Sequence, residues 1–309
     1  MLSLAQPSQY YQIFLSQGIG MGLGLGILYV PTSAVVSHHF KSRRALAMGL
    51  VDSSASLGGI AFSILLNQLI HGSVGFVWGV RIAGFITMGI LVIGNLLLHV
   101  PPLTAAPNSS ANFKDAPYLL TIAWGFVSFL GMYFPSFYVQ LFARMHGISS
   151  GFAFYSLAIL NFASMFGRVV PNYLADKYGT MPFFLPSVTL AGLVQFAMLG
   201  CTNIPGLTFF VIFYGFFFGT AMALYLPLIA ELTPEGLNMG KRMGYGCVPM
   251  GIASLVGPSI SGAIMGNNKY LWWKGILFSS LTTSGSSILL VAAWYIHRKR
   301  RLQTQVKSA

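Results

Sequence analysis

GLTFFVIFYGFFFGTAMALYLPLIAE, residues 206–231, is the stretch that decides the class of fold. Its only charged side chain is Glu231, at the last position. A helix that crosses a bilayer needs about 20 predominantly apolar residues, and its backbone must satisfy its own hydrogen bonds. The stretch is too long and too continuous for a strand of a membrane barrel. We therefore predict a transmembrane α-helix here.

The composition extends this prediction to the whole chain. Charged residues make up 7% and hydrophobic residues 55% of the 309 positions, and the mean hydropathy is +0.72. Soluble domains carry about a quarter charged residues. We predict an all-α, polytopic membrane bundle of nine helices, with spans at approximately 10–37, 45–70, 75–99, 118–142, 151–175, 181–201, 206–231, 241–265 and 272–296.

The positions of lysine and arginine predict how the chain is oriented. If the N-terminus lies outside the cell, the cytoplasmic side holds all but four of the 17 basic residues, the exceptions being Arg81, Arg144, Lys269 and Lys274. The positive-inside rule favours this arrangement. We assign the net charge of +12 to topology and to contact with membrane lipids, and expect no nucleic-acid partner. The basic run at 298–301 is either a solvated flank of the last span or a lipid or partner site.

One substantial linker divides the chain. It is PPLTAAPNSSANFKDAP, rich in proline and small polar residues. The linker separates three spans from six, whereas a carrier built of two equivalent bundles has equal numbers on each side. We predict a three-helix part at 1–100, a cytoplasmic loop at 101–117, a six-helix part at 118–297 and a basic cytoplasmic tail at 298–309.

The fifth predicted span carries a polar stripe. Four polar residues recur at helical spacing and share one face: Asn161, Ser164, Arg168 and Asn172. A charged residue inside a membrane is costly, so such a stripe turns toward the bundle interior or a wet cavity. Arg168 can bind an anionic group through a bidentate contact. Alternatively, it snorkels to the inner headgroups or pairs with Asp176.

Three further charges are candidates for coupling and gating. Asp52 lies inside the second span, where it can take and release a proton or serve as a hydrogen-bonded helix contact. Asp176 and Lys177 lie at the membrane edge. Asp176 can accept hydrogen bonds from a helix N-terminus and so latch two helices together. The alternative is a solvated turn that ends at Gly179.

The sequence shows no constellation typical of an enzyme. GIGMGLGLG, residues 18–26, follows no predicted strand, and its glycines recur every fourth residue, which indicates helix packing instead of nucleotide binding. The six histidines lie at span ends without cysteines or carboxylates at metal-ligand spacing. Cys201 and Cys247 both fall in apolar segments, as small core residues do. We expect no enzymatic activity, no cofactor and no metal.

Four stretches resemble the major facilitator superfamily, and within it the fungal proteins similar to monocarboxylate transporters. They are GLGLGILYVP with HHFKSRRALAMGL, GMYFPSFYVQLFA, FGRVVPNYLADKYG, and LYLPLIAELTP with KRMGYGCVPMGIASLVGPSISG. Together they cover nearly the whole chain. The resemblance implies twelve helices in two halves of six, joined by a cytoplasmic loop. On that template the nine spans are helices 4 to 12, residues 101–117 are the central loop, and the first three helices are missing.

The resemblance also implies roles for single residues. Arg168 falls where monocarboxylate transporters carry an arginine implicated in binding the substrate carboxylate. Their aspartate four residues earlier is replaced here by Ser164. Asp52 stands where the pattern usually has a small residue. Tyr133 and Tyr138 either face the cavity or pack toward lipid.

The function that follows is a secondary transporter, which moves a small organic, monocarboxylate-like anion by alternating access. The predicted substrate-binding residues are Arg168, Asn161, Ser164 and Tyr138. The predicted coupling and gating residues are Asp52, Asp176 and Lys177. A proton is the candidate coupling ion, and the plasma membrane is the expected location. Two alternatives remain open: an efflux pump for a fungal secondary metabolite, and a truncated or sensor-like relative that does not transport.

Overall fold

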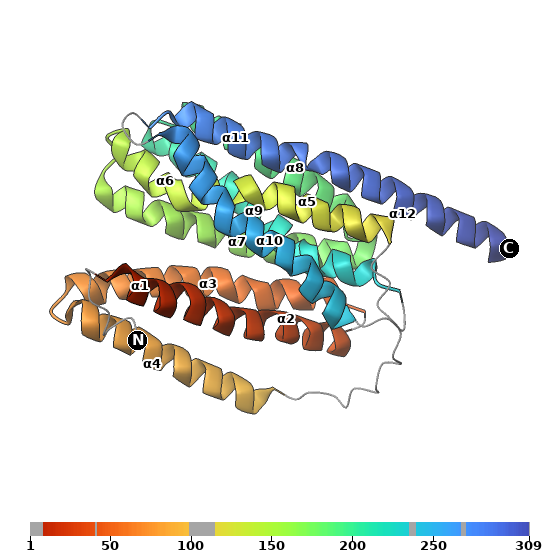
Figure 1. The fold of residues 1–309 in the computed structure, drawn as a ribbon, viewed down its shortest axis with the longest axis horizontal. Coiled ribbons are helices and arrows are strands. Elements are labelled where there is room, and N and C mark those ends of the chain that lie inside the picture. Colours follow the sequence, from red (N-terminus) through yellow and green to blue (C-terminus); the bar gives the residue numbers. More distant parts are fainter. Residues whose placement is uncertain (1–8, 41, 99–114, 235–238, 267–269, 309) are drawn as a thin grey trace.

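The computed structural model describes residues 9–40, 42–98, 115–234, 239–266 and 270–308, and all regular elements in these ranges are helices (Figure 1). They are α1 (Tyr10–Ile13), the π-helical segment η2 (Phe14–Gly20), α2 (Met21–His39), α3 (Arg44–His71), α4 (Gly75–Leu97), α5 (Ala116–Met132), α6 (Phe134–Met145), α7 (Ser150–Tyr178), α8 (Met181–Ala197), the 3₁₀ segment η3 (Met198–Gly200), α9 (Ile204–Glu231), α10 (Met239–Met265), α11 (Trp272–Gly285) and α12 (Ser287–Ser308).

The prediction of an all-α membrane bundle is confirmed. Nine helical stretches in the described residues are long and apolar enough to cross a membrane. The stretch that opened the sequence analysis is α9, and it begins at Ile204 instead of 206 because Asn203 caps it: the Asn203 side chain accepts a hydrogen bond from the Gly206 N–H at 2.8 Å.

Two predicted spans differ from the structure because their helices are interrupted. The span predicted at 118–142 is split into α5 and α6 at Tyr133, just before Pro135, which has no N–H to donate to the preceding turn. The last span is split into α11 and α12 at Ser286. The predicted basic tail is also helical, because α12 continues through the basic run to Ser308.

The helices form two sets that lie side by side in Figure 1. The first set contains α1 to α4, and the second contains α5 to α12. Within the second set, α7 packs closely along α9, since a Cβ atom at Gly167 would clash with the Phe216 carbonyl oxygen. Glycine at such positions lets two membrane helices approach closely.

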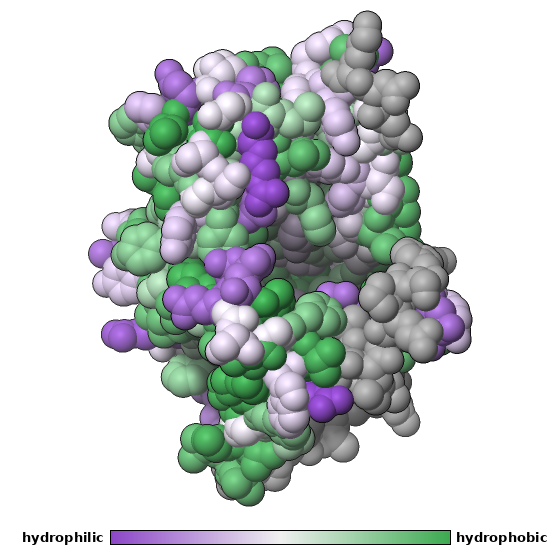
Figure 2. All heavy atoms as spheres, turned by 90° about the vertical axis from the view of Figure 1, so that its left-hand side faces the viewer, coloured by the Kyte–Doolittle hydropathy of each residue, from purple (hydrophilic) through white to green (hydrophobic). Residues whose placement is uncertain are grey.

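Contact between the two sets runs mainly through α3, which packs along α7 and also contacts α9, while α2 contacts α10. A Cβ atom at Gly49 of α3 would clash with the Arg168 carbonyl oxygen. The end of the molecule at the left of Figure 1 is hollowed at this boundary, with hydrophilic side chains around the hollow (Figure 2). The α3–α7 contact is therefore the main boundary between the two sets. Residues of both sets can meet in one site only along this boundary or at the smaller contacts of α3 with α9 and of α2 with α10.

Candidate functional site

Arg168 lies on α7 and its guanidinium crosses to α3. The Nη1 atom donates a hydrogen bond to the carbonyl oxygen of Asp52 at 2.8 Å, and Nε donates to Ser164 Oγ at 3.3 Å. Ser56 of α3 donates to the same Ser164 oxygen at 3.4 Å. The guanidinium therefore turns inward to the boundary between the two helix sets, and pairs neither with Asp176 nor, within the described residues, with any other carboxylate.

The other members of the polar stripe also face α3. A Cβ atom at Gly59 would lie 3.3 Å from the Asn161 side chain, and Asn161 Nδ2 donates to its own helix at Leu157 O, 3.0 Å away. Asn172 is fully buried, and its Nδ2 donates to Arg168 O at 2.6 Å. The structure thus brings all four predicted stripe residues onto the α3–α7 boundary.

Asp52 is the buried carboxylate of this cluster, with 8% of its surface exposed. The hydroxyl of Tyr29, on α2, lies within hydrogen-bonding reach of its side chain. Tyr133 and Cys247 lie within electrostatic range of Asp52, and Tyr133 is also within range of Arg168. We call Tyr29, Asp52, Tyr133, Arg168 and Cys247 the boundary cluster; its members come from α2, α3, the α5–α6 break, α7 and α10.

Two members of the boundary cluster were missed in the sequence. Tyr29 lies three positions before Thr32 and four before Ser33. These three residues line one hollow beside Asp52. That helical spacing of polar groups in a glycine-rich span was the available signal. Cys247 carried no such signal, since its neighbours in sequence are small and apolar.

Tyr138, which the sequence grouped with Arg168, lies elsewhere. Its hydroxyl donates to the Pro258 carbonyl oxygen of α10 at 3.0 Å, and its ring stacks on Phe134 at 4.9 Å. A Cβ atom at Gly262 would lie 2.6 Å from the same hydroxyl. Tyr138 therefore joins α6 to α10, whereas the Tyr133 hydroxyl donates to Met222 Sδ of α9 at 3.9 Å.

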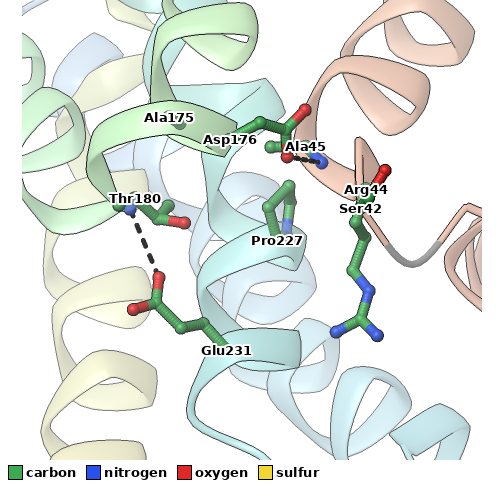
Figure 3. Close-up of a pocket in the computed structure, with 9 residues that line it drawn as sticks. Ser42, Arg44, Ala45, Ala175, Asp176, Thr180, Pro227 and Glu231 are labelled. Carbon is green, nitrogen blue, oxygen red and sulfur yellow. Dashed lines mark hydrogen bonds between the residues drawn. The ribbon is translucent and has the colours of Figure 1, made fainter.

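Asp176 lies at the N-terminus of α3 (Figure 3). Its two carboxylate oxygens accept hydrogen bonds from the backbone N–H groups of Ala45 and Leu46, each at 2.8 Å. A carboxylate is stabilised at this position because the first N–H groups of a helix lack intrahelical partners and carry partial positive charge. The contact joins the C-terminal end of α7 to the other helix set.

Glu231 makes a similar contact within the second set. Its Oε2 accepts a hydrogen bond from the Thr180 N–H at 3.2 Å, where α8 begins. Asp176 and Glu231 line one pocket of about 290 Å³ together with Arg44 (Figure 3). Lys177 instead lies over the Tyr178 ring at 5.4 Å, outside this pocket.

A third charged cluster, absent from the sequence prediction, joins the ends of α5, α10 and α12. Arg242 is fully buried, lies over the Tyr118 ring at 4.0 Å, and pairs with Asp115 at 3.8 Å. Asp115 also accepts a hydrogen bond from Arg300 Nη1. Tyr118 Oη donates to the Arg242 carbonyl oxygen at 2.8 Å. The sequence placed these residues in separate segments, so no spacing rule could bring them together.

The part of the chain that the structure describes contains no group of three or more histidine, cysteine or acidic residues able to hold a metal ion. The substrate-binding, coupling and gating roles of these residues stay predictions. The geometry does define the class of protein: the chain is a multi-pass helical membrane protein with a charged cluster between two helix sets.

The chain belongs to the major facilitator superfamily. The family model matches residues 1–237 and 157–309, so the two matches together cover the chain. It is 35% identical over 266 residues to the aspyridones efflux protein of Emericella nidulans, covering 85% of this chain and 54% of the relative. An MFS-type transporter of the same fungus is 33% identical over 298 residues, covering 95% of this chain and 66% of the relative.

A third relative is the agnestins efflux protein of Paecilomyces divaricatus, 35% identical over 297 residues, which cover 95% of this chain and 67% of the relative. The chain therefore spans between 54% and 67% of the length of these three proteins. The superfamily prediction is confirmed, and the relatives are named as efflux proteins or MFS-type transporters. The narrower resemblance to monocarboxylate transporters stays a prediction.

Proposed function

We propose that the chain belongs to a secondary carrier that exports a small, anionic secondary metabolite by alternating access. The observation that carries this proposal is the position of Arg168, whose guanidinium lies at the boundary between two helix sets instead of at a lipid-facing surface. Charged residues inside a membrane protein typically mark a solute or ion pathway.

Arg168 has donors left for a solute. A guanidinium carries five N–H donors in a planar fork. Two of them are used by Ser164 and by the Asp52 carbonyl, and the rest have no partner among the described residues. A carboxylate, enolate or other planar acid fits such a fork through charge-assisted hydrogen bonds. Asn161 and Ser164 lie beside it and would orient the bound group.

The relatives support export, which the sequence analysis kept open as the alternative of an efflux pump. Two of them are named as efflux proteins for aspyridones and agnestins. We retain an acidic solute because of Arg168, and take a fungal secondary metabolite as the solute class because of these relatives. The plasma membrane is the expected location for such an exporter.

The helix arrangement supports alternating access with the two sets as the moving bodies. Residues 1–100 would contribute to one half and residues 118–297 would form the other, with 101–117 as the cytoplasmic loop between them. Asp176 on the N-terminus of α3 would act as the cytoplasmic latch, since its two hydrogen bonds join the sets. The hollow in Figure 2 lies at the opposite end of α3 and α7, so this conformation fits an outward-facing state.

Rocking of the two sets would break the contact between Arg168 and Asp52 O. Asp52 would then be a place where a proton binds or leaves, which makes a proton the candidate coupling ion. Lys177, beside Asp176 but turned toward Tyr178, would contribute to the electrostatics of the latch without bonding to it.

The test is solute flux with purified carrier in proteoliposomes, using acidic fungal metabolites. Arg168→Gln should abolish flux, while Arg144→Gln, an exposed arginine at the end of α6, should leave it unchanged. If Arg168→Gln moves the acids as well as the wild type does, the proposed function is wrong.

A further inference from the structure

The Ser164 hydroxyl is enclosed between three helices. Its oxygen accepts hydrogen bonds from Arg168 Nε at 3.3 Å and from Ser56 Oγ of α3 at 3.4 Å. On the side of α9, a Cβ atom at Gly219 would lie 2.6 Å from the same oxygen. Ser56 and Ser164 are each only 1% exposed. A side chain so enclosed orients a bound group through the guanidinium that it holds.

One face of α3 supplies the other contact of this guanidinium. Arg168 Nη1 donates to the Asp52 carbonyl oxygen at 2.8 Å, and Asp52 lies one helical turn before Ser56. The face can approach α7 closely because it carries Gly49, at which a Cβ atom would clash with the Arg168 carbonyl oxygen. The α3 helix thus holds two atoms of the guanidinium, Nη1 directly and Nε through Ser164.

These two contacts fix the orientation of the guanidinium and leave its charge available. Both acceptors, the Ser164 hydroxyl and the Asp52 carbonyl, are uncharged oxygens. The third nitrogen, Nη2, has no hydrogen-bond partner among the described residues, so both of its N–H groups can bind an acid. A group that is oriented before binding loses less conformational freedom when it binds. The affinity for an acid therefore depends on the two contacts.

Resting on the proposed function, we infer that Ser56 is a positioning residue for the acidic solute. Ser56 holds Ser164, Ser164 orients the guanidinium of Arg168, and the guanidinium binds the acid. Because Ser56 belongs to the first helix set and Arg168 to the second, this orientation exists only while α3 lies against α7. The carrier therefore binds the acid more tightly in this arrangement of the two sets than in one where α3 and α7 are apart, and the bound acid in turn stabilises this arrangement.

Benzoate is the probe, and its binding is measured on the purified full chain in detergent. A ligand that binds the folded protein raises the midpoint of thermal unfolding, so a titration gives the benzoate concentration at half-saturation. The midpoint without benzoate reports the stability of the fold separately. A residue with only a structural role changes that midpoint and leaves the half-saturating concentration as it is in the wild type.

Ser56→Ala should raise the half-saturating benzoate concentration about five-fold, which is the contribution of a typical hydrogen bond. The matched control is Ser54→Ala on the same helix. Ser54 is exposed, and its hydroxyl donates to the Val51 carbonyl oxygen of α3 itself at 2.6 Å. This control should keep the half-saturating concentration within about two-fold of the wild-type value.

A double variant tests whether Ser56 acts through Ser164. Ser164→Ala alone should weaken benzoate binding at least as much as Ser56→Ala does. Adding Ser56→Ala to Ser164→Ala should then change the half-saturating concentration by less than about two-fold, because the route from α3 to the guanidinium through this hydroxyl is already absent.

An unchanged half-saturating concentration in Ser56→Ala overturns the inference. A further five-fold loss when Ser56→Ala is added to Ser164→Ala overturns it as well, since Ser56 would then act by another route. Failure of the proposed function looks different: benzoate leaves the wild-type midpoint unchanged, or Arg168→Gln saturates at the same benzoate concentration as the wild type. Either of these results overturns the proposed function, and the inference falls with it.

Discussion

Two helices of equal apolarity, α4 and α9, meet different fates in this molecule. Each contains a stretch of mean hydropathy 2.0, yet 61% of that stretch is buried in α9 and only 11% in α4. Their glycines differ in the same way. Added Cβ atoms at Gly215 and Gly219 of α9 would clash with α7, whereas those at Gly84, Gly89 and Gly94 of α4 would meet nothing within 4 Å.

Hydropathy therefore predicts that a segment crosses the membrane, but not which faces of it are covered by protein. In a bilayer the lipid tails are as apolar as leucine, so close packing and polar contacts decide which helices associate. The α7–α9 pair has close packing at its glycines and a polar contact as well. The polar contact is the hydrogen bond that Thr220 Oγ1 donates to the Gly167 carbonyl oxygen at 2.9 Å.

The largest expected effect is that of a branched side chain at the α7–α9 contact. Gly167→Val should destabilise the fold by about 3 kcal/mol or more, because the new side chain meets the Phe216 backbone, which cannot move aside. The matched change Gly89→Val in α4 should cost less than about 0.5 kcal/mol. Thermal unfolding in detergent measures the stability of both variants. Equal losses of stability would contradict the claim that α9 is closely packed by protein and α4 is not.

The second test compares two arginines that each lie over an aromatic ring. Arg242 is fully buried over Tyr118 at 4.0 Å, whereas Arg81 of α4 is half-buried over Trp78 at 5.1 Å. Arg242→Met leaves Asp115 and the Leu232 carbonyl with one donor fewer, and should cost about 3 kcal/mol. Arg81→Met should cost less than about 1 kcal/mol. If Arg81→Met cost more stability than Arg242→Met, the buried arginine would not be the more stabilising of the two.

The third and smallest effect concerns the contact between the two sets. Asp176→Asn keeps the shape of the side chain but removes the charge at the α3 N-terminus, and should cost about 1 kcal/mol. Lys177→Gln next to it should change stability by less than about 0.5 kcal/mol. Labelling of a single cysteine at Ser42, which lines the pocket beside Asp176, should also become faster in Asp176→Asn only. Unchanged labelling would mean that Asp176 does not hold the latch.

Most of the fold follows from the sequence because each span is decided locally. Apolar length predicted the nine candidate membrane spans of the described residues, and the polar stripe on α7 predicted the face that meets α3. The breaks at Tyr133 and Ser286 were not predicted, since a proline or serine inside an apolar run is also compatible with a continuous helix.

The sequence predicted which site residues share a face of one helix, but not which helices meet at the site. Asn161, Ser164 and Arg168 share a face of α7, so spacing sufficed. Tyr29 and Cys247 reach the same place from α2 and α10, and Asp115 reaches Arg242 across a long separation in sequence. Such groupings depend on tertiary packing, which hydropathy and periodicity do not encode.

The central claim is that Arg168 borders a water-accessible path between the two helix sets. It is tested most directly by Ser164→Cys, one helical turn before Arg168, in a chain whose two native cysteines are replaced by serine. We predict that a hydrophilic, negatively charged thiosulfonate modifies this cysteine, and that an acidic solute slows the reaction. Modification only by lipid-soluble reagents, at a rate that no acid changes, would contradict the claim.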